Sequence, residues 1–349
     1  MDLNAAAELL AERAEPAYRV AQARRATLTE YAESWDEVST LPRALRAALD
    51  ARAPLRELAV EEEQVASDGT IKLRLRTADG YPVEAVAMKH RERRTVCLSS
   101  QSGCALACTF CATGAMGLGR NLTPGEILEQ LIVLGRTLRE RDGARVSNVV
   151  MMGMGEPFQN YDRVLEAIRT MNDPSGFGLG ARQIAISTAG WIPGIDRLAA
   201  EPMQVKLALS LHAPDDELRG QLMPVTKRFP IAELMEACSR YRAATRRRVF
   251  VEYLLLEGVN DSRMHARALA NLLRPHGRGA FHVNLIAYNP TAAGFKGSAS
   301  YVVEQFAQEL ERGNVGSSYR QSRGREIDAA CGQLAMSGVP ARRRATAKV

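Results

Sequence analysis

Three of the six cysteines in this chain lie within eight positions, at Cys104, Cys108 and Cys111 of the segment "SGCALACTFCATG". Their spacing is C-x3-C-x2-C, and most of the residues around them are small. Clustered cysteines in a reducing compartment indicate metal or redox chemistry rather than disulfide bonds. Three thiolates can hold three irons of a [4Fe-4S] cubane, and the fourth iron is then left without a protein ligand.

An iron with an open coordination position can chelate the amino and carboxylate groups of S-adenosyl-L-methionine. An electron passed into the sulfonium then yields methionine and a 5′-deoxyadenosyl radical. The spacing therefore predicts a three-cysteine [4Fe-4S] site that uses this cofactor. Zinc is the rival metal, and it would need Cys97 or a distant histidine as its fourth ligand. Three structural thiols are the remaining alternative, because a disulfide would leave one of the three cysteines unpaired.

Strand-like apolar runs alternate with helical stretches from about residue 95 to residue 320. This succession of six βα units predicts an α/β fold, a partial (βα)6 barrel of the TIM type. The predicted strands cover residues 95–100, 146–153, 183–190, 204–212, 249–258 and 281–289. Such barrels carry their chemistry on the loops that follow the carboxyl ends of the strands. Since "CALACTFC", "MGEP", "STAG", "SLHA" and "YNP" all follow predicted strands, we expect them to share one site.

The remaining segments predict a small appendage at each end of this core, which we place at residues 95–336. Residues 1–58 have apolar side chains at helical spacing and predict an N-terminal helical accessory domain. Residues 59–94 alternate in polarity around the turn "ADGY" and predict a short β-hairpin extension. The basic residues of 337–349 predict a disordered tail.

The composition of the chain and its N-terminal residues indicate where the protein is located in the cell and what kind of partner it could bind. The formal net charge of +6 permits a polyanionic partner without requiring one. No run of about 18 apolar residues is present, so we expect no membrane span. The first residues carry acids early and lack the apolar stretch of a signal peptide. We therefore expect a cytoplasmic protein with no membrane association, in which cysteines stay reduced.

A series of segments, in order and with similar gaps, resembles the radical-SAM RNA adenine methyltransferases of the RlmN/Cfr family over about residues 60–336. They are "VCLSSQSGCALACTFCATGAMG", "NVVMMGMGEPFQNYD", "ISTAG", "LALSLHAP", "VEYLLLEGVND", "NLIAYNP" and "SRGREIDAACGQLA". The C-x3-C-x2-C spacing alone would indicate only the superfamily, whereas "RGREIDAACGQL" is specific to this family. One departure is Tyr288, where many members have Trp before Asn-Pro. We expect this difference to change packing and not chemistry.

The resemblance implies cofactor-binding roles for the matching residues. Cys104, Cys108 and Cys111 would bind the [4Fe-4S] cluster. Residues at the strand ends would contact S-adenosyl-L-methionine, of which two molecules are used per turnover. These residues are Gly155, Glu156, Ser187, Ser210, Leu211, His212 and Asn289.

The resemblance also implies three catalytic residues outside the cysteine triplet. The target carbon of adenine, between two ring nitrogens, is not a nucleophile, so polar methyl transfer to it fails. Cys331 would instead carry the methyl group, whose hydrogen is removed by the radical so that the resulting methylene radical adds to the base. Glu84, matched by position, would accept the ring proton. Cys97 would then attack Cys331, and the transient disulfide would release the product.

The implied reaction is methylation of carbon 2 of an adenosine in 23S rRNA near the peptidyl-transferase centre. The same reaction is implied for certain tRNAs, at the adenosine 3′ to the anticodon. The N-terminal accessory domain would bind RNA, an electron donor of the flavodoxin or ferredoxin type would supply electrons, and we expect a monomer. The carbon-8 methylase that confers ribosomal antibiotic resistance shares every one of these cysteines, but "GYPVEAV" and "MMGMGEP" favour carbon 2. A non-catalytic metal-binding or RNA-binding protein is an alternative of a different class.

A basic rim around the barrel mouth is expected to meet RNA phosphates, since the target base must leave its stack to be modified. The candidate rim residues are Lys89, Arg91, Arg93, Arg94, Arg320, Arg323 and Arg325.

Overall fold

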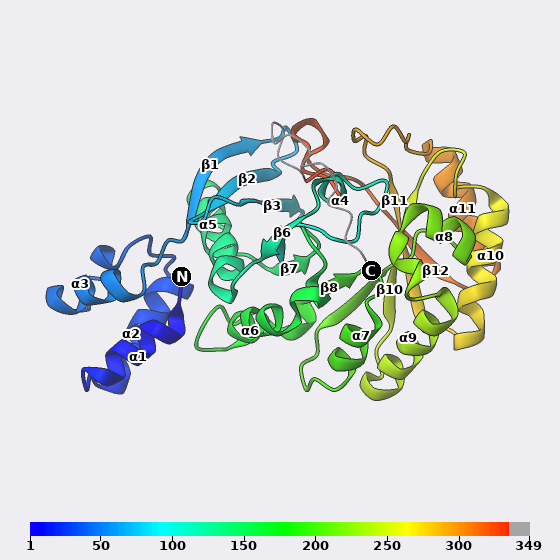
Figure 1. Ribbon diagram of the computed structural model, residues 1–349. Coiled ribbons are helices and arrows are strands. Elements are labelled where there is room, and N and C mark those ends of the chain that lie inside the picture. The colour runs from blue at the N-terminus through cyan, green and yellow to red at the C-terminus, as the bar shows by residue number, and fades with distance from the viewer. Residues whose placement is uncertain (335–349) are drawn as a thin grey trace.

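One open ten-stranded sheet organises the molecule (Figure 1). The structure is a computed structural model and describes residues 1–334, so the tail predicted at 337–349 and the last two residues of the predicted core lie outside the described residues. The strand order is β1-β2-β3-β4-β7-β8-β9-β10-β11-β12. Strands β1 to β4 pair antiparallel, and every pair from β4 to β12 is parallel.

All six predicted parallel strands are present, and each observed strand ends two or more residues before the end of its predicted range. The parallel strands are β4 (Arg93–Cys97), β7 (Asn148–Met151), β8 (Ile184–Thr188), β9 (Lys206–Ser210), β10 (Val249–Leu255), β11 (Phe281–Ala287) and β12 (Gly316–Arg320). The α/β fold with an unclosed barrel is therefore confirmed, but the parallel part has a seventh strand. The sequence of β12, "GSSYR", has no apolar alternation by which it could have been predicted.

The strands before β4 form a three-stranded antiparallel meander rather than a hairpin. Its strands are β1 (Leu58–Val65), β2 (Ile71–Thr77) and β3 (Pro82–His90). The "ADGY" turn joins β2 to β3, as expected. β1 forms the edge of the sheet, and three consecutive glutamates hide its alternation in the sequence.

Three helices precede the sheet, and the longer helices of the rest of the chain follow strands. The helices are α1 (Leu3–Glu12), α2 (Ala17–Leu28), α3 (Arg43–Arg52), α4 (Ala112–Met116), α5 (Pro124–Asp142), α6 (Tyr161–Asn172), α7 (Ile192–Ala199), α8 (Asp216–Leu222), α9 (Ile231–Thr245), α10 (Arg263–Leu273) and α11 (Ser300–Arg312). Helices α1–α3 lie beside α5 and α6 (Figure 1). Hydrogen bonds such as Asn4 Nδ2 to Glu166 Oε1, 3.0 Å, join them. None of the helices described within residues 1–334 is long and apolar enough to cross a membrane.

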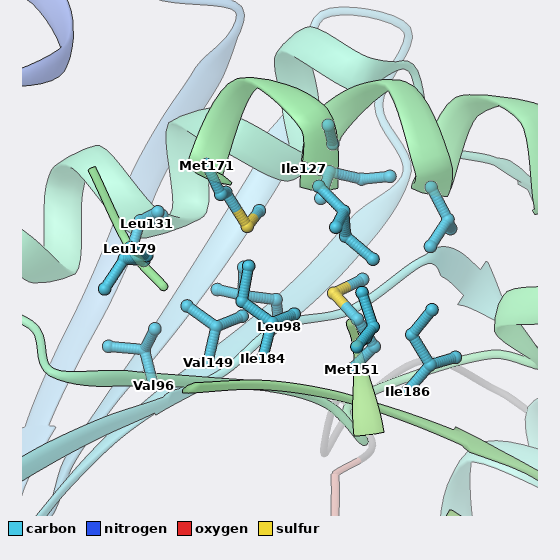
Figure 2. Packing of buried hydrophobic residues seen from close by; sticks show 14 of the residues in the cluster. Val96, Leu98, Ile127, Leu131, Val149, Met151, Met171, Leu179, Ile184 and Ile186 are labelled. Atoms are coloured by element: carbon cyan, nitrogen blue, oxygen red, sulfur yellow. The ribbon is translucent and has the colours of Figure 1, made fainter. Parts of the chain in front are cut away.

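The two faces of the parallel sheet differ in chemistry. Val251 and Tyr253 of β10 belong to the hydrophobic core that the helices cover, whereas Glu252 between them points to the opposite face. Figure 2 shows part of that core, where strand side chains meet α5 and α6: Val96, Val149, Met151, Ile184, Ile186, Ile127, Leu131 and Met171. The opposite face carries polar residues and Cys97, so the chemistry lies on the side that the helices leave open.

A small hairpin, β5 (Gln101–Gly103) with β6 (Leu118–Asn121), interrupts the βα succession after β4. The three clustered cysteines lie in the segment between these two strands. α5 follows the hairpin and begins with a capping box. Thr123 Oγ1 accepts from the backbone N–H of Glu126 at 3.1 Å, and the Glu126 carboxylate accepts from the N–H of Thr123 at 2.8 Å.

Replacing Thr123 with alanine is expected to lower the free energy of unfolding by about 1 kcal/mol, because one N–H at the start of α5 loses its acceptor. Urea-induced unfolding followed by circular dichroism measures the change. Thr137→Ala is the matched control, since Thr137 lies inside α5 and only bonds back to Val133 O. Equal losses in both variants would show that the cap contributes nothing.

Candidate active site

The cysteine triplet lies on a tight loop between β5 and α4. Cys104 directly follows β5, Cys111 directly precedes α4, and all three thiols are free and half-buried. Gly103 has φ +74°, and a Cβ atom there would lie 1.9 Å from the carbonyl oxygen of Gly117. The N–H of Cys104 donates to that same oxygen at 2.9 Å. The glycines next to the triplet therefore let the loop fold back on itself.

The electrostatics of the triplet suit a metal cluster. Burial raises the pKa of Cys104 to about 12, and the charges of Glu156 and Cys111 add to this effect. Burial also raises the pKa of Cys108, as do Cys111 and Cys104, whereas Arg219 lowers it. Thiolates this close repel one another, and bound iron would offset that repulsion because a coordinating thiol gives up its proton.

The arrangement of the cysteines bears on which metal fits. Within residues 1–334, no three His, Cys, Asp or Glu side chains converge as they would around a single metal ion. In a cubane, each thiolate binds a different iron, so three thiolates need not converge on one point.

A buried carboxylate follows β7. Glu156 is 2% exposed; its Oε2 accepts from the N–H of Ala189 at 2.8 Å and its Oε1 from Phe158 N–H at 3.1 Å. Burial raises the pKa of Glu156 to about 7. The preceding Gly155 has φ +99°, and a Cβ atom there would lie 2.5 Å from the Cβ of Gln101. Any larger residue would push the carboxylate out of place.

The ends of β8 and β9 bring the next predicted residues together. The Ser187 and Ser210 hydroxyl oxygens lie 3.4 Å apart. Leu211 is fully buried, and His212 takes a left-handed conformation with φ +60°. The Nδ1 atom of His212 accepts from the N–H of Leu254 at 3.0 Å. Burial lowers the pKa of His212 to about 3, so its ring is neutral at pH 7 with the proton on Nε2.

Within the part of the chain that the structure describes, Asn289 has a buried side-chain amide without hydrogen-bond partners. Its side chain is fully buried, and neither its Oδ1 nor its Nδ2 has a hydrogen-bond partner among the described residues. A buried amide without partners is costly, so a polar ligand is expected to fill this place. The hydroxyl of Tyr288 donates to Phe110 O at 3.4 Å, which ties this segment to the cysteine loop. The residues at these strand ends therefore fit S-adenosyl-L-methionine.

The two outlying cysteines, Cys97 and Cys331, lie in the same region of the molecule. Cys97 ends β4 and packs in a small apolar cluster with Ala329, close to Cys331 in the chain. Burial raises the pKa of Cys97, and the charge of Cys331 raises it further. The N–H of Ala112, at the start of α4, donates to Gly332 O at 2.9 Å. The structure thus brings Cys97, Cys331 and the triplet together, with both outlying thiols free.

Glu84 lies on β3 and on the same face of the sheet as Cys97. Val86, two residues along β3, pairs with Cys97, and Glu84 is 1% exposed. Lys72 Nζ lies 3.9 Å from Glu84 Oε1 and also donates to Asp328 O at 3.5 Å. A buried lysine that the sequence analysis did not single out therefore connects Glu84 to the segment that carries Cys331.

Four of the predicted rim residues are not at the barrel mouth. Lys89, Arg91, Arg93 and Arg94 lie at the turn between β3 and β4, at the amino end of β4, whereas the cysteines follow carboxyl ends. The rim prediction is therefore wrong for these four, because a run of basic residues in sequence says nothing about which end of a strand it occupies. The candidates at and beyond the carboxyl end of β12 are Arg320, Arg323 and Arg325.

Arg219 is a fully buried charged residue that the sequence analysis missed. It is 0% exposed, and its guanidinium donates to the carbonyl oxygens of Leu211 (3.2 Å), Ala189 (2.6 Å) and Ser210 (3.2 Å). A further bond goes to the Thr226 hydroxyl at 3.0 Å. Arg219 thus ties the loop after β8 to the loop after β9. The only signal in the sequence is a charged residue on the apolar side of a short helix.

Comparison with known proteins places this fold and these strand ends in the radical SAM class, because residues 98–269 match the family model described as the Radical SAM superfamily. A "Probable dual-specificity RNA methyltransferase RlmN" of Chloroflexus aurantiacus is 48% identical over 343 residues, which cover 96% of this chain and 91% of that protein. A protein of the same name from Thermus thermophilus is 47% identical over 322 residues, 91% of this chain and 89% of that protein. The chain belongs to this RlmN family.

A solved structure agrees with this assignment. The crystal structure of a radical SAM methyltransferase from Sphaerobacter thermophilus superposes with a TM-score of 0.91 at 47% identity. The match covers 95% of this chain and 97% of that one. The family implies a [4Fe-4S] cluster and S-adenosyl-L-methionine, which the free thiols and the unpartnered Asn289 amide fit.

Arg219→Leu is expected to lower the free energy of unfolding of the cluster-free protein by about 3 kcal/mol, because three carbonyl groups and a hydroxyl lose their donor. Anaerobic urea unfolding measures this loss. Arg278→Leu, at an exposed position, is the matched control and is expected to change little. A loss no larger than that of the control would contradict the role of Arg219 in joining the loops.

Proposed function

We propose that this protein methylates carbon 2 of adenosine in RNA, both in 23S rRNA and, in tRNA, at the adenosine 3′ to the anticodon. The observation that carries the proposal is that Cys97 packs against the segment of Cys331, which is hydrogen-bonded to the end of the cysteine loop, with both thiols free. A radical generator alone needs only the triplet and has no need of a further pair of cysteines. The "dual-specificity RNA methyltransferase" names of the relatives support RNA as the substrate.

The bound cluster and S-adenosyl-L-methionine would supply the methyl group and the radical chemistry. Cys104, Cys108 and Cys111 would hold the cluster. The Glu156 carboxylate, pinned by two backbone N–H groups, would face the ammonium group of S-adenosyl-L-methionine. Gly155, Ser187, Ser210, Leu211, His212 and Asn289 would make the other contacts, and the unpartnered Asn289 amide would gain its missing hydrogen bonds.

Cys331 would carry the methyl group as a thioether, and the carbon on its sulfur would become bonded to the base. The Glu84 carboxylate, held between β3 and Lys72, would accept the proton from the ring carbon. The Cys97 thiolate would then attack the sulfur of Cys331. The new S–S bond forms as the C–S bond breaks, and the electron pair of that bond stays with the carbon, which takes a proton to become the product methyl group.

The competing candidates are distinguishable in the product and the metal content. A carbon-8 methylase would use the same cysteines, and a non-catalytic protein would bind RNA or zinc without turnover. We further propose that the protein acts as a cytoplasmic monomer that takes electrons from a donor of the flavodoxin or ferredoxin type. Four irons per chain after anaerobic reconstitution would support the enzyme, and one tight zinc would defeat it.

RNA incubated with reconstituted protein, S-adenosyl-L-methionine and a reductant is expected to contain 2-methyladenosine, as measured by nucleoside mass spectrometry. Cys331→Ala is expected to abolish product, because no other residue carries the methyl group. Cys97→Ala is expected to leave RNA covalently attached to Cys331, since the release step loses its nucleophile. Cys238→Ala is the matched control, because Cys238 is buried in the core on α9.

A product methylated only at carbon 8 would overturn the choice of carbon 2. Absence of any covalent adduct with Cys97→Ala under turnover conditions would overturn release by disulfide formation. Loss of product in the Cys238→Ala control would show that general destabilisation explains the other losses.

The affinity for S-adenosyl-L-methionine is expected to fall as the pH drops below 7. The pKa of Glu156 is raised to about 7, and only the ionised carboxylate attracts an ammonium group, so the loss approaches about tenfold per pH unit well below that pKa. Anaerobic calorimetric titration between pH 5.5 and 8.5 measures it. Glu156→Gln is expected to bind weakly at every pH, whereas Glu236→Gln, at an exposed site, keeps the wild-type profile. An unchanged pH profile in Glu156→Gln would contradict the assignment.

A further inference from the structure

A polar row crosses the open face of the sheet from β9 to β12. Ser210 pairs with Glu252, Glu252 with Asn284, and Asn284 with Ser318, so all four side chains point to one face. Ser210 is at the cofactor end of this row. The chain that leaves β12 at the other end leads to Cys331. Glu252 and Asn284 have no part in the mechanism above, although they lie between its two halves.

A chain of hydrogen bonds fixes these side chains. Asn284 Nδ2 donates to Glu252 Oε1 at 2.7 Å, and Arg320 Nε donates to Asn284 Oδ1 at 3.2 Å. Glu252 is 8% exposed and Asn284 is 3% exposed, whereas Arg320, at the end of β12, is open to solvent. Because both ends of the Asn284 amide are used, its orientation is set, and with it the separation of the carboxylate from the guanidinium.

Some hydrogen-bonding atoms of Glu252 and Arg320 have no partner among the residues that the structure describes. Within residues 1–334, Oε2 of Glu252 and the two terminal nitrogens of Arg320 make no hydrogen bond. An unpartnered carboxylate oxygen and an unpartnered cationic donor therefore lie at opposite ends of the Asn284 amide. Neither is fully buried, so both are open to a ligand.

The space beside these groups borders the methyl-carrying cysteine. Burial raises the pKa of the Cys331 thiol; the charge of Glu252 raises it further, and that of Arg320 lowers it. Cys331 is exposed as a residue, so solvent weakens both influences. A direct contact supports the placement: Gln333 Nε2, two residues after Cys331, donates to Pro290 O at 3.0 Å, just beyond the carboxyl end of β11. Cys111 of the triplet also acts on Cys331. A molecule held by Glu252 and Arg320 would thus meet the carbon that Cys331 carries.

We propose that Glu252 and Arg320, held apart by Asn284, read the Watson–Crick edge of the target adenine. The Oε2 atom of Glu252 accepts a hydrogen bond from the exocyclic amino group, and Arg320 donates to N1. This inference rests on the proposed function, because a base in this space is the one that is methylated. Carbon 2 lies on the same edge as the amino group, directly beyond N1, so reading that edge aims carbon 2 at Cys331.

The pattern also explains selection and activation. Guanine presents a carbonyl where adenine has its amino group and an N–H where adenine has N1, so it would oppose the carboxylate and the guanidinium at both positions. A cationic donor at N1 withdraws electron density from the neighbouring carbon 2. This makes carbon 2 more receptive to the carbon delivered by Cys331.

The test uses RNA in which the target adenosine is replaced by purine riboside, which keeps N1 and the hydrogen on carbon 2 but lacks the amino group. The wild-type holoenzyme is expected to prefer adenosine by about tenfold to a hundredfold in kcat/KM, the range of one hydrogen bond to a charged group. Glu252→Ala is expected to methylate adenosine more slowly and to lose the preference, with a ratio near one. Glu257→Ala, at the exposed position just after β10, is the matched control and keeps the wild-type ratio.

Two further measurements keep the test decisive. Glu252→Ala is expected to bind S-adenosyl-L-methionine with wild-type affinity, which a collapsed site would not do. Arg320→Ala, at the surface, is expected to lower kcat about tenfold or more and to weaken the preference for adenosine, because N1 loses its donor and Asn284 is released.

The outcomes separate this inference from the function it rests on. If the wild-type enzyme methylates no adenosine, the proposed function fails. If it methylates adenosine and both Glu252→Ala and Arg320→Ala keep the full preference for adenosine over purine riboside, the reading of the base by these residues is wrong.

Discussion

Successive side chains of a β-strand point to opposite faces of the sheet, and the candidate site residues that lie within strands depend on that alternation. On β10, Val251 and Tyr253 fill the core under the helices, while Glu252 faces the open side. The same parity sets Cys97 on β4 and Asn284 on β11 to that side. A shift of one residue in any of these strands would bury a polar group among apolar side chains and remove it from the site.

The region around the candidate site holds several buried polar groups, and most of them have partners. Glu156 accepts two backbone N–H groups, and Glu84 lies against Lys72. Arg219 satisfies four oxygens of neighbouring loops. Asn289 is the exception, since neither end of its amide has a partner within residues 1–334. Partnered groups hold the loops in place, and the exception marks where a ligand is required.

The sequence predicted the six strands that are apolar and nearly continuous, because burial on a parallel sheet demands such runs. The sequence did not predict β12, because this edge strand has the sequence "GSSYR" and no buried apolar residue. It also did not predict β1 as a separate strand, because three consecutive glutamates conceal the alternation of polarity. It also misplaced Lys89, Arg91, Arg93 and Arg94, because charge in a sequence carries no information about the end of a strand at which it will lie. No local sequence pattern predicted roles for Lys72, Arg219 and Glu252.

The spacing of residues in the sequence was sufficient to predict a site wherever all its residues lie in one short segment. The triplet Cys104, Cys108 and Cys111 lies on one loop, so its spacing by itself predicted a three-thiolate site, and the strand-end motifs predicted that several loops would converge. Only the tertiary structure decided that Cys331 lies beside Cys97, that Lys72 connects Glu84 to the C-terminal segment, and that Glu252, Asn284 and Arg320 form one hydrogen-bonded row. Those residues come from distant strands, and the register between strands is set by packing of the whole sheet, which no single segment of sequence contains.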